Sequence, residues 1–171
     1  MDKKLQIIGS NERISIGKRA IDVPAKIDTG ADTSSIWASH IRVGKDGILR
    51  FRLFDEGSKY YSGKVYKRTD YKVAAVRSAS GHVQVRYRTH FTITLAGRKI
   101  RVLFNLSDRS KNQYPVLIGR RTVVGKFIID VSRQVFPRSI KSQTKNLNKK
   151  LKADPYQFHK KYVKMVKEKK I

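Results

Sequence analysis

The sequence predicts an all-β domain over residues 1–135, followed by a basic extension over residues 136–171 that is partly helical. In the first part, short stretches of alternating apolar and polar residues are separated by Gly, Asp and Ser, which is typical of half-buried strands joined by turns. The clearest alternation covers residues 83–95 and continues, after a Gly-containing turn at residues 96–99, into residues 100–106. This pattern predicts a long hairpin. A chain of 171 residues accommodates one such domain with an extension.

The remaining elements are predicted from shorter patterns. In the strand at residues 48–54, Leu49, Phe51 and Leu53 form the predicted buried face, and Phe54 lies on the opposite face. The other predicted strands cover residues 5–7, 14–16, 21–27, 73–76, 114–119 and 126–131, and one helical turn is predicted at residues 120–125.

The pattern changes after residue 131. Residues 134–152 are polar, basic and weakly periodic, which predicts a linker or a partly disordered arm. Asp154 and Pro155 then provide an N-cap and a first-turn proline for a helix. The apolar residues that follow share one face of this helix: Phe158, Tyr162, Met165 and Val166. The helix either docks on its own domain or on a partner, or presents a basic face to a membrane or nucleic acid.

The formal net charge is +26, from 39 Lys and Arg against 13 Asp and Glu. Residues 138–171 carry +10 of this charge, so the positive charge is spread over both parts of the chain. Such a charge attracts polyanions, and the candidates are nucleic acid, the ribosome, an anionic membrane and an acidic peptide. Charge alone does not choose among them.

Several classes of site are excluded by composition. The chain has no Cys, which excludes disulfides, a thiol nucleophile and a Cys-type zinc site. His40, His82, His90 and His159 lack metal-ligand spacing, and no phosphate-binding GxxxxGK[ST] loop occurs, so neither a metal nor another cofactor is expected. The apolar runs are too short for a signal peptide or a membrane span, and we expect a soluble, cytoplasmic protein.

Residues 25–36 read AKIDTGADTSSI and place two carboxylates, Asp28 and Asp32, beside Gly30. Asp-Thr-Gly also occurs in plain turns. Here, however, an apolar strand leads into the motif, and a second apolar motif, PVLIGRRTVVG, follows about 85 residues later.

A strand that ends in Asp suits peptide hydrolysis without a metal. One carboxylate takes a proton from water while a second carboxyl group, about 3 Å away, hydrogen-bonds the carbonyl oxygen, and the two share one proton. Thr29 could lock such a loop through its hydroxyl, and Gly30 lets another backbone come close.

Residues 27–33 (IDTGADT) resemble the active-site loop of retropepsin-type aspartic peptidases, and residues 116–120 (VLIGR) resemble their second signature. More narrowly, AKIDTGADTSSIWASHI, VRSASGHVQVRYR and YPVLIGRRTVVG, in that order, are similar to a bacterial retropepsin-like family. That family is catalogued as ATP-dependent zinc proteases and linked to ribosomal-protein modification. The resemblance covers about residues 10–131 and implies a closed β-barrel with one short helix. These residues do not support the zinc and the ATP of the catalogue name.

The resemblance implies that Asp28 is the catalytic aspartate, supported by Thr29 and Gly30, and that the turn at residues 77–81 is a flap over the substrate. To these flap residues we add Arg86 and Arg88, because their positive charges could pair with substrate carboxylates. A solvated strand face would also explain these arginines. The expected substrate-binding residues are Ala31, Asp32, Arg77, Ser78, Ala79, Ser80, Gly81, Arg86 and Arg88. The narrower family more often has a basic residue in place of Asp32, so its specificity cannot be copied.

The chain contains a single Asp-Thr-Gly, whereas the mechanism needs two aspartates. An active enzyme should therefore be a symmetric homodimer that brings two copies of Asp28 together. Asp32 is too near in sequence to be that partner, and we expect it to pair with an Arg or with a substrate backbone amide.

Two functions are consistent with the sequence. The first is an aspartic endopeptidase whose acidic, glutamate-rich substrate pairs with Arg77, Arg86 and Arg88. The link of the family to ribosomal-protein modification, in which glutamate tails are added, favours that substrate. The second is a weak or inactive module that binds RNA, the ribosome or another polyanion. The interleaved basic and aromatic residues 59–72 favour it, although such tracts are more often solvated strands.

Overall fold

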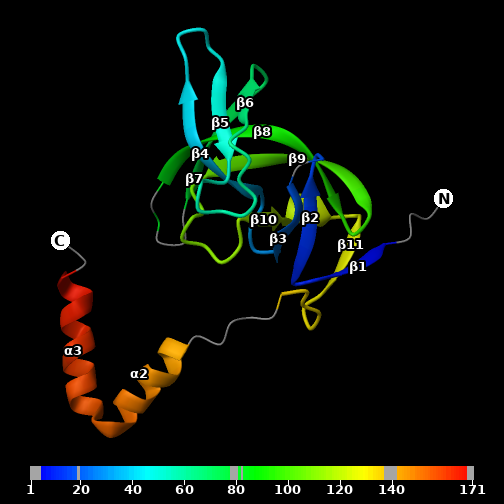
Figure 1. Ribbon diagram of the computed structural model, residues 1–171. Coiled ribbons are helices and arrows are strands. Elements are labelled where there is room, and N and C mark those ends of the chain that lie inside the picture. Colours follow the sequence, from blue (N-terminus) through cyan, green and yellow to red (C-terminus); the bar gives the residue numbers. More distant parts are fainter. Residues whose placement is uncertain (1–4, 19, 78–80, 82, 137–141, 169–171) are drawn as a thin grey trace. The chain divides into compact units, whose positions relative to one another are not determined.

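The structure is a computed structural model that describes residues 5–18, 20–77, 81, 83–136 and 142–168. The chain forms two compact units, Met1–Phe136 and Pro137–Ile171 (Figure 1). The first unit contains β1 (Gln6–Gly9), β2 (Asn11–Ile16), β3 (Ala20–Asp28), β4 (Ser34–Val43), β5 (Leu49–Leu53), β6 (Val65–Arg68), β7 (Lys72–Arg77), β8 (Val83–Leu95), β9 (Arg98–Ser107), β10 (Val116–Gly119), α1 (Arg120–Val123) and β11 (Phe127–Asp130). The second unit contains α2 (Ser142–Ala153) and α3 (Pro155–Glu168).

Six strands of the first unit form a closed barrel. Their order is β10-β3-β2-β8-β9-β4, and β4 pairs with β10 to close the ring. β10 therefore lies between β3, which is parallel to it, and β4, which is antiparallel. β5 and β6 extend the sheet beyond β4, and β7 pairs with the first half of β8. The predicted all-β barrel with a short helix is confirmed.

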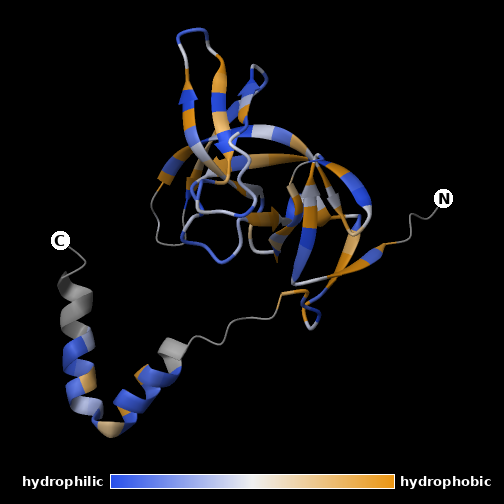
Figure 2. Cartoon of the chain, viewed as in Figure 1, coloured by the Kyte–Doolittle hydropathy of each residue, from blue (hydrophilic) through white to orange (hydrophobic). Residues whose placement is uncertain are grey.

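The barrel interior is filled by side chains from alternate positions of the strands. On β8 and β9 the predicted alternate positions from residue 89 onward are buried, namely Thr89, Phe91, Ile93, Leu95, Ile100, Val102, Phe104 and Leu106. Burial stabilises such large apolar side chains by about 1.5–3 kcal/mol each. Val83 and Val85 continue the same alternation but are exposed, and Asn105 and Ser107 are buried although they lie at the other positions. Figure 2 shows apolar and polar residues alternating along the barrel strands, whereas α2 and α3 are mainly hydrophilic.

The turn between β8 and β9 is shorter than predicted. Leu95 pairs with Arg98, so only Ala96 and Gly97 form the turn, and their φ angles are 47° and 78°. Two-residue turns with positive φ match the twist of the flanking strands and favour glycine.

Phe54 is buried, which contradicts the prediction that it lies on the exposed face. Leu49, Phe51 and Leu53 are buried as predicted, but β5 ends at Leu53 and Phe54 has a φ of 63°. This left-handed conformation breaks the alternation. The N–H of Phe54 donates to the carbonyl of Trp37 at 3.0 Å, and the two rings lie edge to face with centroids 6.2 Å apart.

The second unit consists of helices that the sequence predicts only in part. The N-cap expected at Asp154 is present, because its carboxylate accepts a hydrogen bond from the N–H of Gln157 at 2.9 Å. The prediction of a linker over residues 134–152 is wrong for residues 142–152, which belong to α2. Helix-favouring Lys, Leu and Gln dominate α2, but Leu147 and Leu151 alone give a weak periodic signal. In the described part of the chain, no helix is long and apolar enough to cross a membrane.

Asn11 fastens the segment after β11 to the barrel. Its buried side chain accepts hydrogen bonds through Oδ1 from the N–H groups of Val135 at 2.9 Å and Phe136 at 2.7 Å. Its Nδ2 donates to the carbonyl of Phe136 at 2.9 Å and to the hydroxyl of Tyr114 at 3.1 Å. One side chain therefore binds both the N–H and the carbonyl of Phe136, which is distant in sequence.

β10 ends in close contact with the loop that follows β3. A Cβ added to Gly119 would lie 2.5 Å from the carbonyl carbon of Thr33 and 2.8 Å from its nitrogen. Such an approach is possible only without a side chain. The N–H of Gly119 donates to Oγ of Ser34 at 3.1 Å, and this hydroxyl pairs with that of Thr122 on α1 at 2.8 Å.

We expect Asn11→Ala to lower the free energy of unfolding by roughly 1–3 kcal/mol, because the amides of Val135 and Phe136 lose their acceptor. Amide hydrogen exchange at these two residues should become faster than in the parent. Ser10→Ala is the control, since it removes only an exposed hydrogen bond of 3.2 Å to Arg133. Unchanged amide exchange at Val135 and Phe136 in Asn11→Ala would contradict the role of Asn11 in holding this segment.

Gly119→Ala should destabilise the barrel by roughly 1–3 kcal/mol or more in chemical denaturation, because the new methyl group overlaps the main chain of Thr33. Gly57→Ala is a matched control, since a Cβ at Gly57 meets nothing within 4 Å. Equal loss of stability in both variants would show that the close approach at Gly119 does not matter.

Candidate active site

Asp28 is the last residue of β3, where β3 and β10 run side by side. Its main chain is in register with that of Gly119. The N–H of Gly30 donates to Oδ1 of Asp28 at 3.2 Å, and the N–H of Ala31 donates to its carbonyl at 3.2 Å. The side chain of Asp28 is 27% exposed. The carboxylate is therefore oriented by its own loop and open to solvent.

α1 holds this loop from the other end. The N–H of Arg120 donates to the carbonyl of Ala31 at 2.8 Å, and the N–H of Arg121 donates to that of Asp32 at 3.2 Å. Arg120 also forms an ion pair with the carboxylate of Asp32, and Nη2 of Arg121 lies 3.9 Å from it. Asp32 thus has an Arg partner, as the sequence predicts, and its described contacts are with α1.

Lys26 and Arg109 are cationic side chains that interact with Asp28. Nζ of Lys26 lies 3.4 Å from Oδ2 of Asp28. Arg109, in the loop after β9, interacts electrostatically with Asp28 and with Arg86, and its Nε donates to the carbonyl of Tyr114 at 3.0 Å. Burial lowers the pKa of Arg109, the charge of Arg86 lowers it further, and the charge of Asp28 opposes this shift. Since a guanidinium stays protonated in proteins, the site is strongly cationic.

The sequence predicts Arg86 at this site but not Lys26 or Arg109. A signal for Lys26 exists, because residues two apart on a strand share a face, and Lys26 precedes Asp28 by two positions. No local pattern points to Arg109, which reaches the site from a loop between β9 and β10.

The two arginines predicted on β8 lie in different places. Arg86 lines a hollow of about 510 Å³ together with Trp37 of β4. Arg88 lines a separate hollow of about 270 Å³ beside Thr33 and Arg121. Of the two, Arg86 is the one whose charge is linked to the surroundings of Asp28.

The turn predicted as a flap, residues 77–81, follows β7 and precedes β8 in the chain, and these two strands pair with each other. Their pairing reaches Arg77, which is exposed, and Gly81 has a φ of 85°. The predicted flap residues Ser78, Ala79 and Ser80 lie outside the described residues.

The sequence matches a known family over most of the barrel. The model of the RimB-like family, described as retropepsin-like aspartic endopeptidase RimB, matches residues 7–139. Curated relatives named probable alpha-L-glutamate ligase are 33% identical over 132 residues in Shewanella halifaxensis and 28% identical over 134 residues in Parasynechococcus marenigrum. These matches cover 74% and 76% of this chain but 28% of each relative. The chain therefore spans little more than a quarter of the length of these relatives.

A solved structure shares the fold. The Legionella pneumophila protein Lpg0085, of unknown function, superposes with a TM-score of 0.56 at 23% identity, covering 77% of this chain and 97% of that one. A foamy viral protease-reverse transcriptase in complex with an RNA/DNA hybrid gives a TM-score of 0.42 at 13% identity, covering 82% of this chain and 14% of that one. Since the family match includes every barrel strand together with Asp28 and Gly119, the chain belongs to the RimB-like family of retropepsin-like aspartic endopeptidases.

Proposed function

We propose that this protein is an aspartic endopeptidase in which two copies of Asp28, one from each subunit of a homodimer, hydrolyse peptide bonds. The substrate class is an acidic, glutamate-rich chain such as a tail on a ribosomal or other protein. The observation that carries the proposal is the placement of Asp28. Its carboxylate is open to solvent, is oriented by the N–H of Gly30, and lies in a loop that α1 fixes.

The chemistry follows from two carboxyl groups that share one proton. The ionised group removes a proton from water, and the water oxygen attacks the carbonyl carbon of the peptide bond. The protonated group donates its hydrogen to the carbonyl oxygen. When the tetrahedral intermediate collapses, the C–N bond breaks and the leaving nitrogen takes a proton from the pair. Gly30 orients Asp28 throughout, because its N–H is bound to Oδ1.

A second copy of the chain completes the pair, because each chain carries a single Asp-Thr-Gly. A twofold axis beside Asp28 brings identical loops together, so each subunit contributes the same residues. Thr29 and Gly30 are exposed at this loop, which leaves them accessible to the loop of the other subunit.

The cations around Asp28 support an acidic substrate. Lys26 and Arg109 offer an ammonium and a guanidinium near Asp28, and the charge of Arg86 acts on Arg109. Charge-assisted hydrogen bonds to carboxylates are about twice as strong as neutral ones. The half-buried position of Arg109 strengthens its interaction with a carboxylate, because less water screens it. The curated relatives are named for glutamate, and the proposal extends that chemistry to the substrate of this chain.

A second candidate function is a weak or inactive module that binds RNA, the ribosome or another polyanion. One observation favours it: the basic tract at residues 59–72 contributes Lys64 and Arg68 to a hollow that Lys18 also lines. Two results together would support this module: the parent protein cleaves no peptide, and Asp28→Asn binds polyanions as tightly as the parent does.

Asp28→Asn should reduce the turnover number on acidic peptides by roughly a thousandfold or more, because the shared-proton pair is lost. The parent should show a bell-shaped dependence of kcat/KM on pH, and the variant should not. Asp22→Asn is the control, since Asp22 has a positive φ of 55° that Asn also tolerates. Activity retained in Asp28→Asn would refute the mechanism. Poly-glutamate left intact while a mixed acidic peptide is cut would refute the substrate class.

Arg86→Gln should lower kcat/KM for glutamate-rich peptides roughly threefold to tenfold and have a smaller effect on peptides with neutral side chains, since one charged partner is removed. Arg42→Gln removes an exposed charge from β4 and serves as the control. The measurement is steady-state kinetics on paired acidic and neutral peptides. Equal losses on both peptides would mean that Arg86 does not select for carboxylates.

A further inference from the structure

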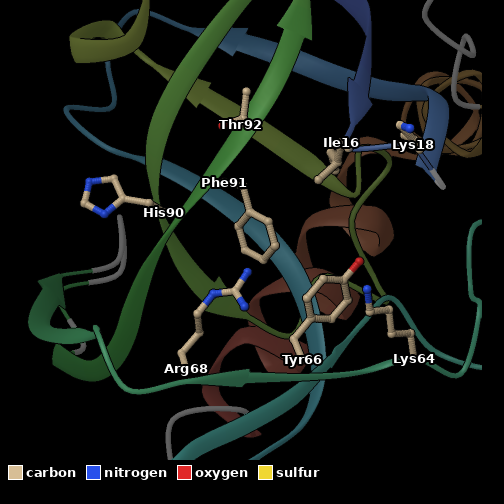
Figure 3. Close-up of a pocket in the computed structure, with 9 residues that line it drawn as sticks. Ile16, Lys18, Lys64, Tyr66, Arg68, His90, Phe91 and Thr92 are labelled. Carbon is tan, nitrogen blue, oxygen red and sulfur yellow. The ribbon is translucent and has the colours of Figure 1, made fainter.

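Three adjoining hollows meet at His90 of β8. The first, of about 420 Å³, is shown in Figure 3 and is lined by Lys18, Lys64 and Arg68 around the rings of Tyr66 and Phe91. The second, of about 160 Å³, shares Arg68 with the first. The third, of about 270 Å³, lies between the β8–β9 hairpin and α1. His90 lines all three, and the third also shares Arg101 with the second, so the hollows lie in one adjoining row on the barrel.

Along this row of hollows, the charged side chains are almost all positive. The Lys and Arg side chains along it, which we call the basic track, are Lys18, Lys64, Arg68, Arg88, Arg101, Arg121 and Lys126. Asp70 is the one carboxylate among the described residues that line the three hollows. It lies 4.0 Å from Arg101, and both side chains are largely exposed, so water screens this pair. The track therefore has cations in excess and needs an anion to balance them.

Arg88 lines the third hollow and carries a buried hydrogen-bond donor that no described residue satisfies. Its Nε is buried and has no hydrogen-bond partner within the residues that the structure describes. Arg88 pairs across the hairpin with Asn105, whose Nδ2 donates to the hydroxyl of Thr33 at 2.8 Å. A buried donor without an acceptor is unfavourable. Oδ1 of Asn105 is buried without a partner among the described residues as well, so the paired residues Arg88 and Asn105 leave one donor and one acceptor unsatisfied.

An acidic polypeptide fits the track better than RNA does. Single-stranded nucleic acids gain much of their affinity by stacking bases on exposed aromatic rings. Tyr66 already stacks on Phe51 with centroids 5.6 Å apart, Lys64 and Arg68 lie over its ring, and Phe91 is buried. In Figure 3 the Arg68 and Lys64 side chains flank the Tyr66 ring. In an extended peptide, every second side chain points the same way, which suits a row of cations.

We propose that the basic track is an exosite that binds the acidic part of the substrate outside the catalytic site. The inference rests on the proposed function, because that function supplies the acidic chain. The track ends at Arg121, whose N–H holds the carbonyl of Asp32 in the active-site loop. A tail that lies along the track is therefore kept next to the loop that carries Asp28, and its local concentration at the site rises.

The test compares two double variants with equal charge change, both made in the Asp28→Asn protein so that the ligand is not consumed. Arg68→Gln with Arg101→Gln removes two cations from the track. Lys67→Gln with Lys99→Gln removes two exposed neighbours on the same strands, β6 and β9, that do not line the three hollows. The ligand is a fluorescent poly-glutamate peptide, and its affinity is measured by anisotropy at low and at physiological ionic strength.

The track variant should bind poly-glutamate about fivefold more weakly than the Asp28→Asn protein in which it is made, and the control variant should bind as tightly as that protein. Equal weakening in both double variants would overturn the proposal, since only overall charge would then matter. A polyuridylate that binds more tightly than the peptide, and alone depends on Arg68 and Arg101, would also overturn it. Arg101→Gln against Lys99→Gln gives the same comparison without disturbing the packing of Arg68 on Tyr66.

Binding and cleavage separate the two proposals. Track-dependent binding with no hydrolysis by the parent would support the exosite and refute the endopeptidase. Hydrolysis by the parent with no difference between the double variants in binding would refute the exosite and leave the endopeptidase supported.

Discussion

The parallel pairing of β3 with β10 is the contact on which both the barrel and the candidate active site depend. It places Gly119 in register with Asp28, and it brings Gly119 so close to Thr33 that no Cβ fits. α1 starts immediately after this contact and returns its N–H groups to the carbonyls of Ala31 and Asp32. Barrel closure and the orientation of the carboxylate are therefore achieved by the same residues, and a loss of one implies a loss of the other.

The seam around this pairing is polar although it is buried. Ser34 pairs with Thr122 at 2.8 Å, and Ser35 pairs with Ser107 at 2.7 Å. Buried hydroxyls stabilise a structure when each finds a partner and are costly when one is missing. Hydrogen bonds also depend on direction, so these pairs restrict the register of β4 against β9 and α1. Such a restriction suits a loop that must hold one carboxylate in one orientation.

Buried polar residues also explain why some strands can be predicted from the sequence and others cannot. β8 and β9 are predictable because apolar residues fill their alternate inward positions, whereas β4 begins with buried Ser34 and Ser35 and shows no such period. Phe54 enters the core through a positive φ that no local pattern reveals. In the site, Asp28 follows from a local motif. Arg109 does not, because only the folded barrel brings its loop to Asp28.

The positive charge of the chain separates into two kinds once burial is considered. Lys67 and Lys99 are exposed, so they add to a general field that salt screens within about 10 Å. Arg109 is half-buried beside Arg86, and Nε of Arg88 is buried without a partner in the described part of the chain. Removing a cation from water is unfavourable unless an anion offsets the cost. A protein that only attracted polyanions would need the exposed kind alone. Arg109 near Asp28 and Arg88 in the basic track are of the less exposed kind, and they favour recognition of individual carboxylates.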